Sequence, residues 1–156
     1  MSELRFSKTD PRAQAPTRAH PGDAGLDLCC LATVELGPGE RLRVATGIAV
    51  ELPPGHAGLI VPRSGLAAKH GLSIVNAPGL IDEGYRGELQ VVLLNTDRER
   101  AVSLKAGERI AQLVVISVAQ LAPVEVESLE DSSRGDQGFG SSGREVLTPA
   151  AAQAAR

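Results

Sequence analysis

The stretch Asn76-Ala-Pro-Gly-Leu-Ile-Asp-Glu-Gly-Tyr-Arg-Gly-Glu88 separates two apolar runs, residues 72–75 and 89–94, that have the composition of strands. A connection between strands usually needs only a few residues, whereas this one is longer and carries acidic, basic and aromatic side chains between glycines. Glycine lets a ligand approach the backbone closely, and loops held by strands often carry binding or catalytic residues. The stretch therefore predicts a functional loop between two strands, or a hairpin that carries a solvated acidic pair.

Short strands and turns account for most of the remaining chain. From Val34 onwards, apolar runs cover residues 42–50, 58–61, 101–104, 110–118 and 124–126, and Leu4 with Phe6 suggests an edge strand near the N-terminus. Because these runs recur at short spacing with almost no helical period, the sequence predicts an all-β sandwich or barrel. We expect one short helix, Ser64–His70, with Ser64 as its N-cap and Gly71 as its C-cap.

The composition predicts a core without aromatic residues. The 156 residues suffice for one domain, and 42% of them are hydrophobic, but the aromatic residues are only Phe6, Tyr85 and Phe139. Tyr85 and Phe139 are flanked by glycines and fall on predicted loops. A loop aromatic can be a lid over a small apolar cluster, but two of them favour a flat ligand such as a base or a sugar.

Charge and cysteine content exclude several functional classes. The net charge of −3 and the lack of a basic cluster argue against a nucleic-acid-binding surface. No apolar run approaches the roughly 20 residues of a membrane span, and without a signal peptide at the N-terminus we expect a cytoplasmic protein. Cys29 and Cys30 are adjacent, so their side chains should point apart as two free thiols. No spacing of His or Cys suggests a zinc site.

Polar residues interrupt two of the apolar segments. Asp23 and Asp27 lie four residues apart in Asp23-Ala-Gly-Leu-Asp-Leu28, and we expect them on one face of a strand. Two like charges there need a cation, water or backbone amides between them, although a turn-capping role would explain one of the two. Gln112 lies within an apolar run, where a buried polar group needs a partner. A cross-strand backbone group is the default partner, and a ligand is the alternative.

Arg63, Ser64 and Gly65 open the predicted helix. A helix N-terminus offers unpaired N–H groups to an anion, and Arg63 and Ser64 would add a guanidinium and a hydroxyl at the same point. An ordinary capped helix explains Ser64, but it does not explain Arg63 or Gly65.

The composition changes near residue 127. We expect a β domain over residues 1–127, a flexible glycine-rich arm over 128–143 and a disordered tail over 144–156. The arm contains Arg134-Gly-Asp-Gln-Gly-Phe-Gly-Ser-Ser-Gly143, whose N–H groups and hydroxyls could wrap a polyphosphate while its ring covers a base.

Five stretches resemble, in order and content, the five motifs of the trimeric dUTP diphosphatases (dUTPases). They are Asp23-Ala-Gly-Leu-Asp-Leu28, Pro62-Arg-Ser-Gly-Leu66, the stretch from Asn76 to Glu88, Gly107-Glu-Arg-Ile-Ala-Gln-Leu113 and Arg134-Gly-Asp-Gln-Gly-Phe-Gly-Ser-Ser-Gly143. Each motif is weak evidence alone, whereas all five in order are specific. Ser142 stands where threonine is common in the family, and it keeps the hydroxyl.

The resemblance implies a β jelly roll, or distorted β-barrel, that assembles into a homotrimer with active sites shared among the subunits. It implies Mg²⁺-dependent hydrolysis of dUTP to dUMP and pyrophosphate, which limits uracil incorporation into DNA and supplies dUMP for thymidylate synthesis. Asp82 would be the general base that activates the attacking water. Asp27 would hold Mg²⁺ through water, since this ion dehydrates reluctantly.

The resemblance also implies a set of substrate-binding residues. The nucleoside would contact Asn76, Leu80, Ile81, Tyr85 and Gln90, with the uracil read in a hairpin too narrow for a thymine methyl and Tyr85 under the deoxyribose. The phosphates would contact Arg63, Ser64, Gly65 and Gln112. The arm would add Arg134 on the γ-phosphate and Phe139 on the uracil, with Gly140, Ser141 and Ser142.

Two other functions are compatible with parts of this pattern. A dCTP deaminase would share the fold and the nucleotide class, but we expect it to carry a second serine in the Pro62 stretch. A jelly-roll module that binds nucleotide or protein without hydrolysis is the other alternative. Asp82 and the complete arm argue against it, since a binding module could lose either without harm.

Overall fold

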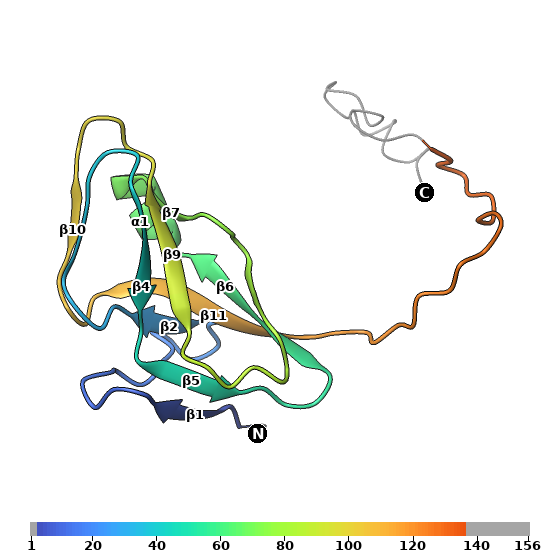
Figure 1. Cartoon of the computed structure of the whole chain (residues 1–156), viewed down its shortest axis with the longest axis horizontal. Coiled ribbons are helices and arrows are strands. Elements are labelled where there is room, and N and C mark those ends of the chain that lie inside the picture. The colour runs from blue at the N-terminus through green and yellow to red at the C-terminus, as the bar shows by residue number, and fades with distance from the viewer. Residues whose placement is uncertain (1–2, 137–156) are drawn as a thin grey trace. The chain divides into compact units, whose positions relative to one another are not determined.

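The computed structural model of the chain describes residues 3–136. It divides into two compact units, Met1–Gln120 and Leu121–Arg156. All helices and strands of the described residues belong to the first unit (Figure 1).

Four antiparallel sheets make up the first unit. Strand β1 (Arg5–Lys8) pairs with β5 (Ile48–Glu51), and β3 (Val34–Leu36) pairs with β10 (Val102–Leu104). A three-stranded sheet has the order β4 (Arg41–Ala45), β9 (Gln90–Asn95), β7 (Leu72–Ile74), with β9 between its neighbours in Figure 1. The largest sheet has the order β2 (Leu26–Cys29), β11 (Arg109–Ser117), β6 (His56–Pro62), β8 (Gly79–Ile81). The predicted all-β jelly roll is confirmed.

Alternation along the strands builds the core. In β9 the side chains of Val91, Leu93 and Asn95 are buried, whereas those between them are more exposed. The apolar cluster consists of Leu, Val, Ile, Ala and one cysteine, so the predicted core without aromatic residues is confirmed for the described part of the chain. Phe6 and Tyr85 lie outside this core, with 45% and 43% of their surface exposed.

Asn95 is the polar centre of this core. Its side chain is fully buried, and Nδ2 donates to the carbonyl oxygens of Leu36 (3.2 Å), Gly37 (3.0 Å) and Arg100 (2.8 Å). Its Oδ1 accepts the N–H of Asp97 at 3.0 Å. One side chain therefore ties the end of β9 to the loops that follow β3 and precede β10.

Helix α1 (Ser64–His70) has the predicted bounds, but its first cap differs from the prediction. The N-cap is Arg63, whose backbone is extended and whose side chain makes no capping bond, so Ser64 is the first helical residue. Gly71 is the predicted C-cap, with φ of 62° and its N–H bonded to the Ala67 carbonyl at 3.0 Å. No helix in the described residues has the length and apolar character to cross a membrane.

The expected strand over residues 124–126 is wrong. Val124 and Val126 are 79% and 56% exposed, and the described part of the second unit, residues 121–136, contains no strand. Alternating apolar residues form a stable strand only where a partner strand takes up their hydrogen bonds. No such partner pairs with this segment in the described chain.

The two cysteines are free thiols, as predicted. Burial raises the pKa of both the Cys29 and the Cys30 thiol. Cys30 is buried just after β2 and donates to the Lys105 carbonyl at 3.0 Å.

Replacing Asn95 by alanine should lower the free energy of unfolding by about 2–4 kcal/mol, because three carbonyl groups lose the buried donor that they share. Urea denaturation monitored by circular dichroism measures this loss. Asn76→Ala, at the chain's other asparagine, is the matched control because that side chain is exposed. Equal losses for the two variants would contradict the anchoring role of Asn95.

Candidate active site

A buried carboxylate gathers three nitrogen donors on the largest sheet. Asp27 lies on β2 with 3% of its surface exposed. Its Oδ1 contacts Arg63 Nε at 3.2 Å and accepts from Gln112 Nε2 at 3.3 Å, and its Oδ2 accepts from Arg109 Nη1 at 3.0 Å. We refer to Asp27, Arg63, Arg109 and Gln112 as the Asp27 cluster.

Strand register brings the Asp27 cluster together. Gln112 on β11 is the register partner of both Asp27 on β2 and Val61 on β6. Arg63 directly follows β6, and Arg109 is the first residue of β11. Both arginines therefore lie within a few residues of the row formed by Asp27, Gln112 and Val61, and their side chains can reach Asp27. Two guanidiniums and one carboxylate give the cluster one net positive charge, which suits an anionic ligand.

Gly25 has a packing reason in the same region. A Cβ at this buried position would lie 3.0 Å from Gln112 Cβ and 3.2 Å from its Cδ. The absence of a side chain therefore lets the chain pass directly under Gln112.

Two expectations about these residues were wrong. Asp23 lies outside β2, in a turn where its Oδ2 accepts the His20 N–H at 2.9 Å, so the two aspartates do not share a strand face. The Gln112 side chain donates to the Asp27 carboxylate and not to a cross-strand backbone group. Because β2 begins only at Leu26, Asp23 is not part of the strand. Asp27 is part of it and is the register partner of Gln112, so the two side chains can meet.

The stretch from Asn76 to Glu88 forms a second cluster. It is not one long loop, because it contains β8, whose Leu80 and Ile81 pair with Leu59 and Gly58 of β6. A cavity of about 180 Å³ is lined by Leu80, Ile81, Asp82, Tyr85, Glu88 and Gln90. We refer to this cavity as the Tyr85 pocket.

Local hydrogen bonds fix Tyr85 in this pocket. Its hydroxyl donates to the Glu88 carbonyl at 2.9 Å, and its N–H donates to the Asp82 carbonyl at 3.0 Å. A Cβ on Gly87 would lie 2.6 Å from Tyr85 Cζ, so the ring packs against the backbone of Gly87. Asp82 is exposed, as is Leu80 at 63%, and the pocket is therefore open to a ligand from outside.

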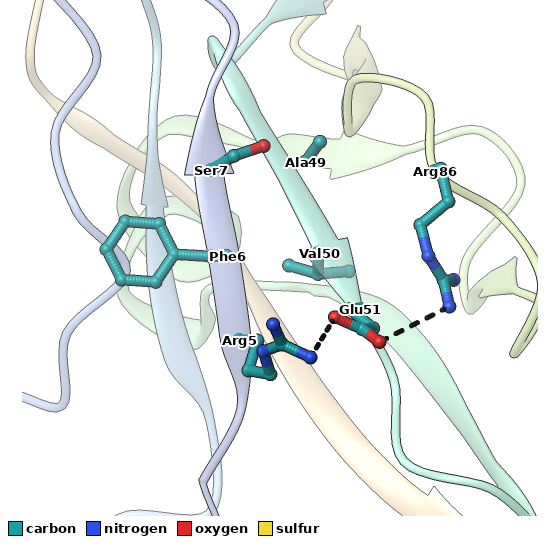
Figure 2. A pocket seen from close by; sticks show the side chains of 7 residues that line it. All are labelled: Arg5, Phe6, Ser7, Ala49, Val50, Glu51 and Arg86. Atoms are coloured by element: carbon teal, nitrogen blue, oxygen red, sulfur yellow. Dashed lines mark ion pairs between the residues drawn. The ribbon is translucent and has the colours of Figure 1, made fainter.

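Arg86 binds the backbone of the Tyr85 loop. Its Nη1 donates to the carbonyls of Glu83 (2.6 Å) and Tyr85 (3.0 Å). Its Nη2 lies 4.0 Å from Glu51, which also pairs with Arg5 at 2.9 Å. Figure 2 shows Glu51 between these two arginines, at a cavity of about 320 Å³ beside β1 and β5. All three side chains are largely exposed, so this contact orients the loop more than it stabilises the fold.

The two clusters lie far apart within one chain. From β2 to β8 there are three strand spacings, or about 14 Å. Along the strands, the row of Val61 and the position of Asp82 beyond Ile81 differ by four residues, or about 13 Å. Asp27 and Asp82 are therefore separated by a distance on the order of 20 Å. One reacting phosphate cannot lie at both clusters of the same chain.

The donor set shows which kind of metal site is possible. No group of three His, Cys, Asp or Glu side chains among the described residues could hold a metal ion. The Asp27 oxygens already meet three nitrogen donors, which leaves about one of the roughly four lone-pair sites of a carboxylate. These residues do not fit an ion held by the protein alone, and Asp27 has room for about one further contact, such as a water molecule of a hydrated cation.

The structure places the predicted site residues of the first unit in two separate regions and does not bring them together within one chain. Leu80, Ile81, Asp82, Tyr85 and Gln90 line one pocket, with Asn76 exposed before β8. Ser64 and Gly65 are exposed next to Arg63. Arg134 is exposed in the second unit, and Phe139, Gly140, Ser141 and Ser142 lie outside the described residues.

Sequence reasoning missed Glu88 and Arg109. Glu88 lines the Tyr85 pocket, and its carboxylate accepts the Gly47 N–H at 2.6 Å and Gln90 Nε2 at 3.2 Å. Glu88 is the last residue of the stretch from Asn76 to Glu88, so its place in that stretch could have identified it as a residue of the pocket. Arg109 reaches Asp27 only through the pairing of β11 with β2, which no local pattern reveals.

Comparison with known proteins identifies close relatives. The dUTPase family model matches residues 11–143. The chain is 56% identical to a deoxyuridine 5′-triphosphate nucleotidohydrolase of Nocardia farcinica over 157 residues, covering 100% of this chain and 95% of the relative. It is 58% identical to the protein of the same name from Thermobifida fusca over 140 residues, covering 90% of this chain and 78% of the relative.

Solved structures give the same result. The dUTPase of Staphylococcus bacteriophage 80alpha, in complex with dUpNHpp, is similar with a TM-score of 0.86 and 32% identity, covering 92% of this chain and 99% of that one. The D95N mutant dUTPase of phage phi11 of S. aureus is similar with a TM-score of 0.77 and 28% identity, covering 83% and 100%. That structure is described as revealing the coordination of a structural Mg(II) ion.

Replacing Gly87 by alanine should displace the Tyr85 ring, because the added Cβ overlaps it. Tyr85 is the chain's only tyrosine and there is no tryptophan, so tyrosine fluorescence reports on this ring alone. We expect acrylamide to quench the fluorescence of the Gly87→Ala variant more strongly than that of the parent protein. Gly84→Ala is the matched control in the same loop, since a Cβ there meets nothing within 4 Å. Identical quenching of the two variants would contradict the packing of Tyr85 on Gly87.

Proposed function

This chain belongs to the dUTPase family and is a dUTP diphosphatase, and we propose that it hydrolyses dUTP to dUMP and pyrophosphate with Asp82 as the general base. The observation that carries this assignment is the position of Asp82, an exposed carboxylate at the rim of the Tyr85 pocket. A ligand bound in that pocket would present its next chemical group to Asp82.

The Tyr85 pocket suits a nucleoside. Its volume of about 180 Å³ is below the roughly 300 Å³ of pockets for drug-sized ligands, so it fits a base or sugar better than a whole nucleotide. We assign uracil and deoxyribose binding to Asn76, Leu80, Ile81, Tyr85 and Gln90. The short β8 offers backbone groups to the edge of the base, and the fixed Tyr85 ring offers a flat surface to the sugar.

We assign the phosphates to Arg63, Ser64, Gly65 and Gln112. Arg63 and Gln112 belong to a cluster with one net positive charge, and a guanidinium can bind phosphate through two parallel hydrogen bonds. Ser64 and Gly65 lie exposed beside Arg63, so a hydroxyl and uncovered backbone are available at the same place.

We propose that the active sites are shared in a homotrimer. The separation of the nucleoside and phosphate clusters within one chain, on the order of 20 Å by strand spacing, supports this arrangement. A site that combines the Tyr85 pocket of one chain with the Asp27 cluster of another would bring both to one nucleotide. The arm residues Arg134, Phe139, Gly140, Ser141 and Ser142 would then cover the substrate, as the sequence predicts.

The chemical step uses one water molecule. The Asp82 carboxylate takes a proton from this water, whose oxygen forms a bond to the α-phosphorus. The bond between the α-phosphorus and the bridging oxygen of the β-phosphate breaks, and pyrophosphate leaves. Arg63 and Gln112 hold the departing phosphates, where negative charge accumulates.

Magnesium is part of this proposal. The ion would neutralise charge on the triphosphate when bound, and Asp27 would hold it through a water molecule. The cytoplasmic location and the role in limiting uracil in DNA while supplying dUMP for thymidylate synthesis stay predictions from the sequence.

Replacing Asp82 by asparagine should lower kcat for dUTP by about 10²–10⁴-fold, because the proton acceptor is lost. Binding of dUpNHpp should change little, since the amide has the shape of the carboxylate. Glu83→Gln is the matched control, because the neighbouring carboxylate instead accepts the Gly55 N–H at 2.8 Å.

The measurement is a product assay with dUTP, dCTP, dTTP and UTP offered separately. Near-parental turnover by the Asp82→Asn variant would contradict the mechanism. Ammonia released from dCTP would indicate a deaminase, and inactivity of the parent protein with all four nucleotides would indicate a binding module.

Gly65→Ala should separate stability from activity. A Cβ at this position meets nothing within 4 Å, so the change should raise the free energy of unfolding by about 0.5–1 kcal/mol through helix propensity. If phosphate approaches the backbone here, the same change should raise KM for dUTP. Urea denaturation and steady-state kinetics measure the two effects. Higher stability with unchanged KM would remove Gly65 from the phosphate site.

A further inference from the structure

Arg63 is the phosphate ligand of the proposed function, and two contacts fix its orientation. Its Nε pairs with Asp27 Oδ1 at 3.2 Å, and its Nη1 donates to the backbone carbonyl of Arg109 at 3.1 Å. The two contacts use Nε and Nη1, on different edges of the guanidinium. Arg63 is 25% exposed, and its Nη2 makes no hydrogen bond within the described part of the chain, so the N–H groups on that atom are available to a ligand.

The carboxylate that orients Arg63 also neutralises its charge, which would weaken the attraction of Arg63 for phosphate. Asp27 is 3% exposed, and a buried carboxylate needs full compensation by nearby cations and donors. If Arg63 were its only cation, the pair would be neutral, and Arg63 would have little net attraction for a triphosphate.

Arg109 resolves this conflict. Its Nη1 donates to Asp27 Oδ2 at 3.0 Å, on the oxygen that Arg63 does not use. The carboxylate is thus compensated by a second guanidinium, and the cluster keeps one net positive charge. Gln112 Nε2 donates a further hydrogen bond to Asp27 Oδ1 at 3.3 Å. The Gln112 amide is neutral, so it cannot replace the positive charge of Arg109.

We propose that Arg109 is a positioning residue that acts through Asp27, keeping Arg63 oriented toward the substrate phosphates and the cluster net positive. This inference rests on the proposed hydrolysis of dUTP, because it assigns a role within the same phosphate site. The proposal gives Asp27 a role in orienting Arg63 besides a role in holding Mg²⁺. A carboxylate that served only to hold Mg²⁺ would not need an arginine paired with each of its oxygens.

The test is a double-mutant cycle on phosphate binding. The dissociation constants of dUpNHpp are measured by isothermal titration calorimetry for the parent protein, Arg109→Gln, Arg63→Gln and the double variant. Each titration is made with Mg²⁺ and again with EDTA. We expect Arg109→Gln to weaken binding by about 10–100-fold, as for loss of a charge-assisted hydrogen bond. The loss in the double variant should be clearly smaller than the sum of the two single losses, because Arg109 acts mainly through Arg63.

Three controls separate positioning from folding. Deoxyuridine, which lacks phosphates, should bind all variants equally. Arg41→Gln, an exposed arginine on β4 in a different sheet, removes the same charge and should leave dUpNHpp binding unchanged. Arg109→Lys keeps the charge and should restore part of the lost affinity even if Arg109→Gln lowers the melting temperature.

Different results of these titrations would contradict the role of Arg109 and the proposed function. Parental affinity of the Arg109→Gln variant, or additive losses in the double variant, would overturn the positioning role of Arg109. A parent protein that binds neither dUpNHpp nor deoxyuridine would instead contradict the proposed function. Losses that occur only with Mg²⁺ and disappear with EDTA would assign the effect to the ion and would also overturn the proposal.

Discussion

The compensation of one buried carboxylate links the fold of this protein to its chemistry. Asp27 is 3% exposed, and it has Arg109, Gln112 and Arg63 as partners only while β2, β11 and β6 keep their register. A slip of one residue in any of these pairings would turn the side chains of that strand to the opposite face and leave a charge unpaired. The Asp27 cluster therefore exists only in the correctly paired sheet, and its ion pairs in turn favour that pairing.

Strand β6 separates the two chemical tasks. It leads into Arg63 at one end, and near the other end its pairing with β8 positions Asp82 and the Tyr85 loop. A strand is stiff, so it holds Arg63 and the Tyr85 loop apart within one chain. Under the proposed function, a site that uses both would need assembly between chains. The same rigidity gives each half its geometry before substrate arrives, which reduces the cost of ordering at the moment of binding.

The sequence predicted what depends on local pattern. Alternation and turn residues predicted the all-β fold, the bounds of α1 and the Gly71 cap, and the scarcity of aromatic residues predicted an aliphatic core. Predictions that depended on tertiary pairing were wrong or missing. Residues 124–126 have the alternation of a strand but no partner in the described chain, and Ser64 lost the cap position because Arg63 remains extended. Arg109 was missed because 82 residues separate it from Asp27 and only the sheet joins them.

The described glycines differ in whether the chain's own conformation and packing require them. Most of them have an internal reason, which is either a positive φ or a neighbour that would collide with a Cβ, as Tyr85 would with one on Gly87. Among the described glycines, only Gly65 and Gly84 have neither. Gly65 lies two residues after Arg63, and Gly84 lies between Asp82 and Tyr85. The two described glycines that the chain's own conformation and packing do not require thus lie in the two stretches to which we assign substrate binding.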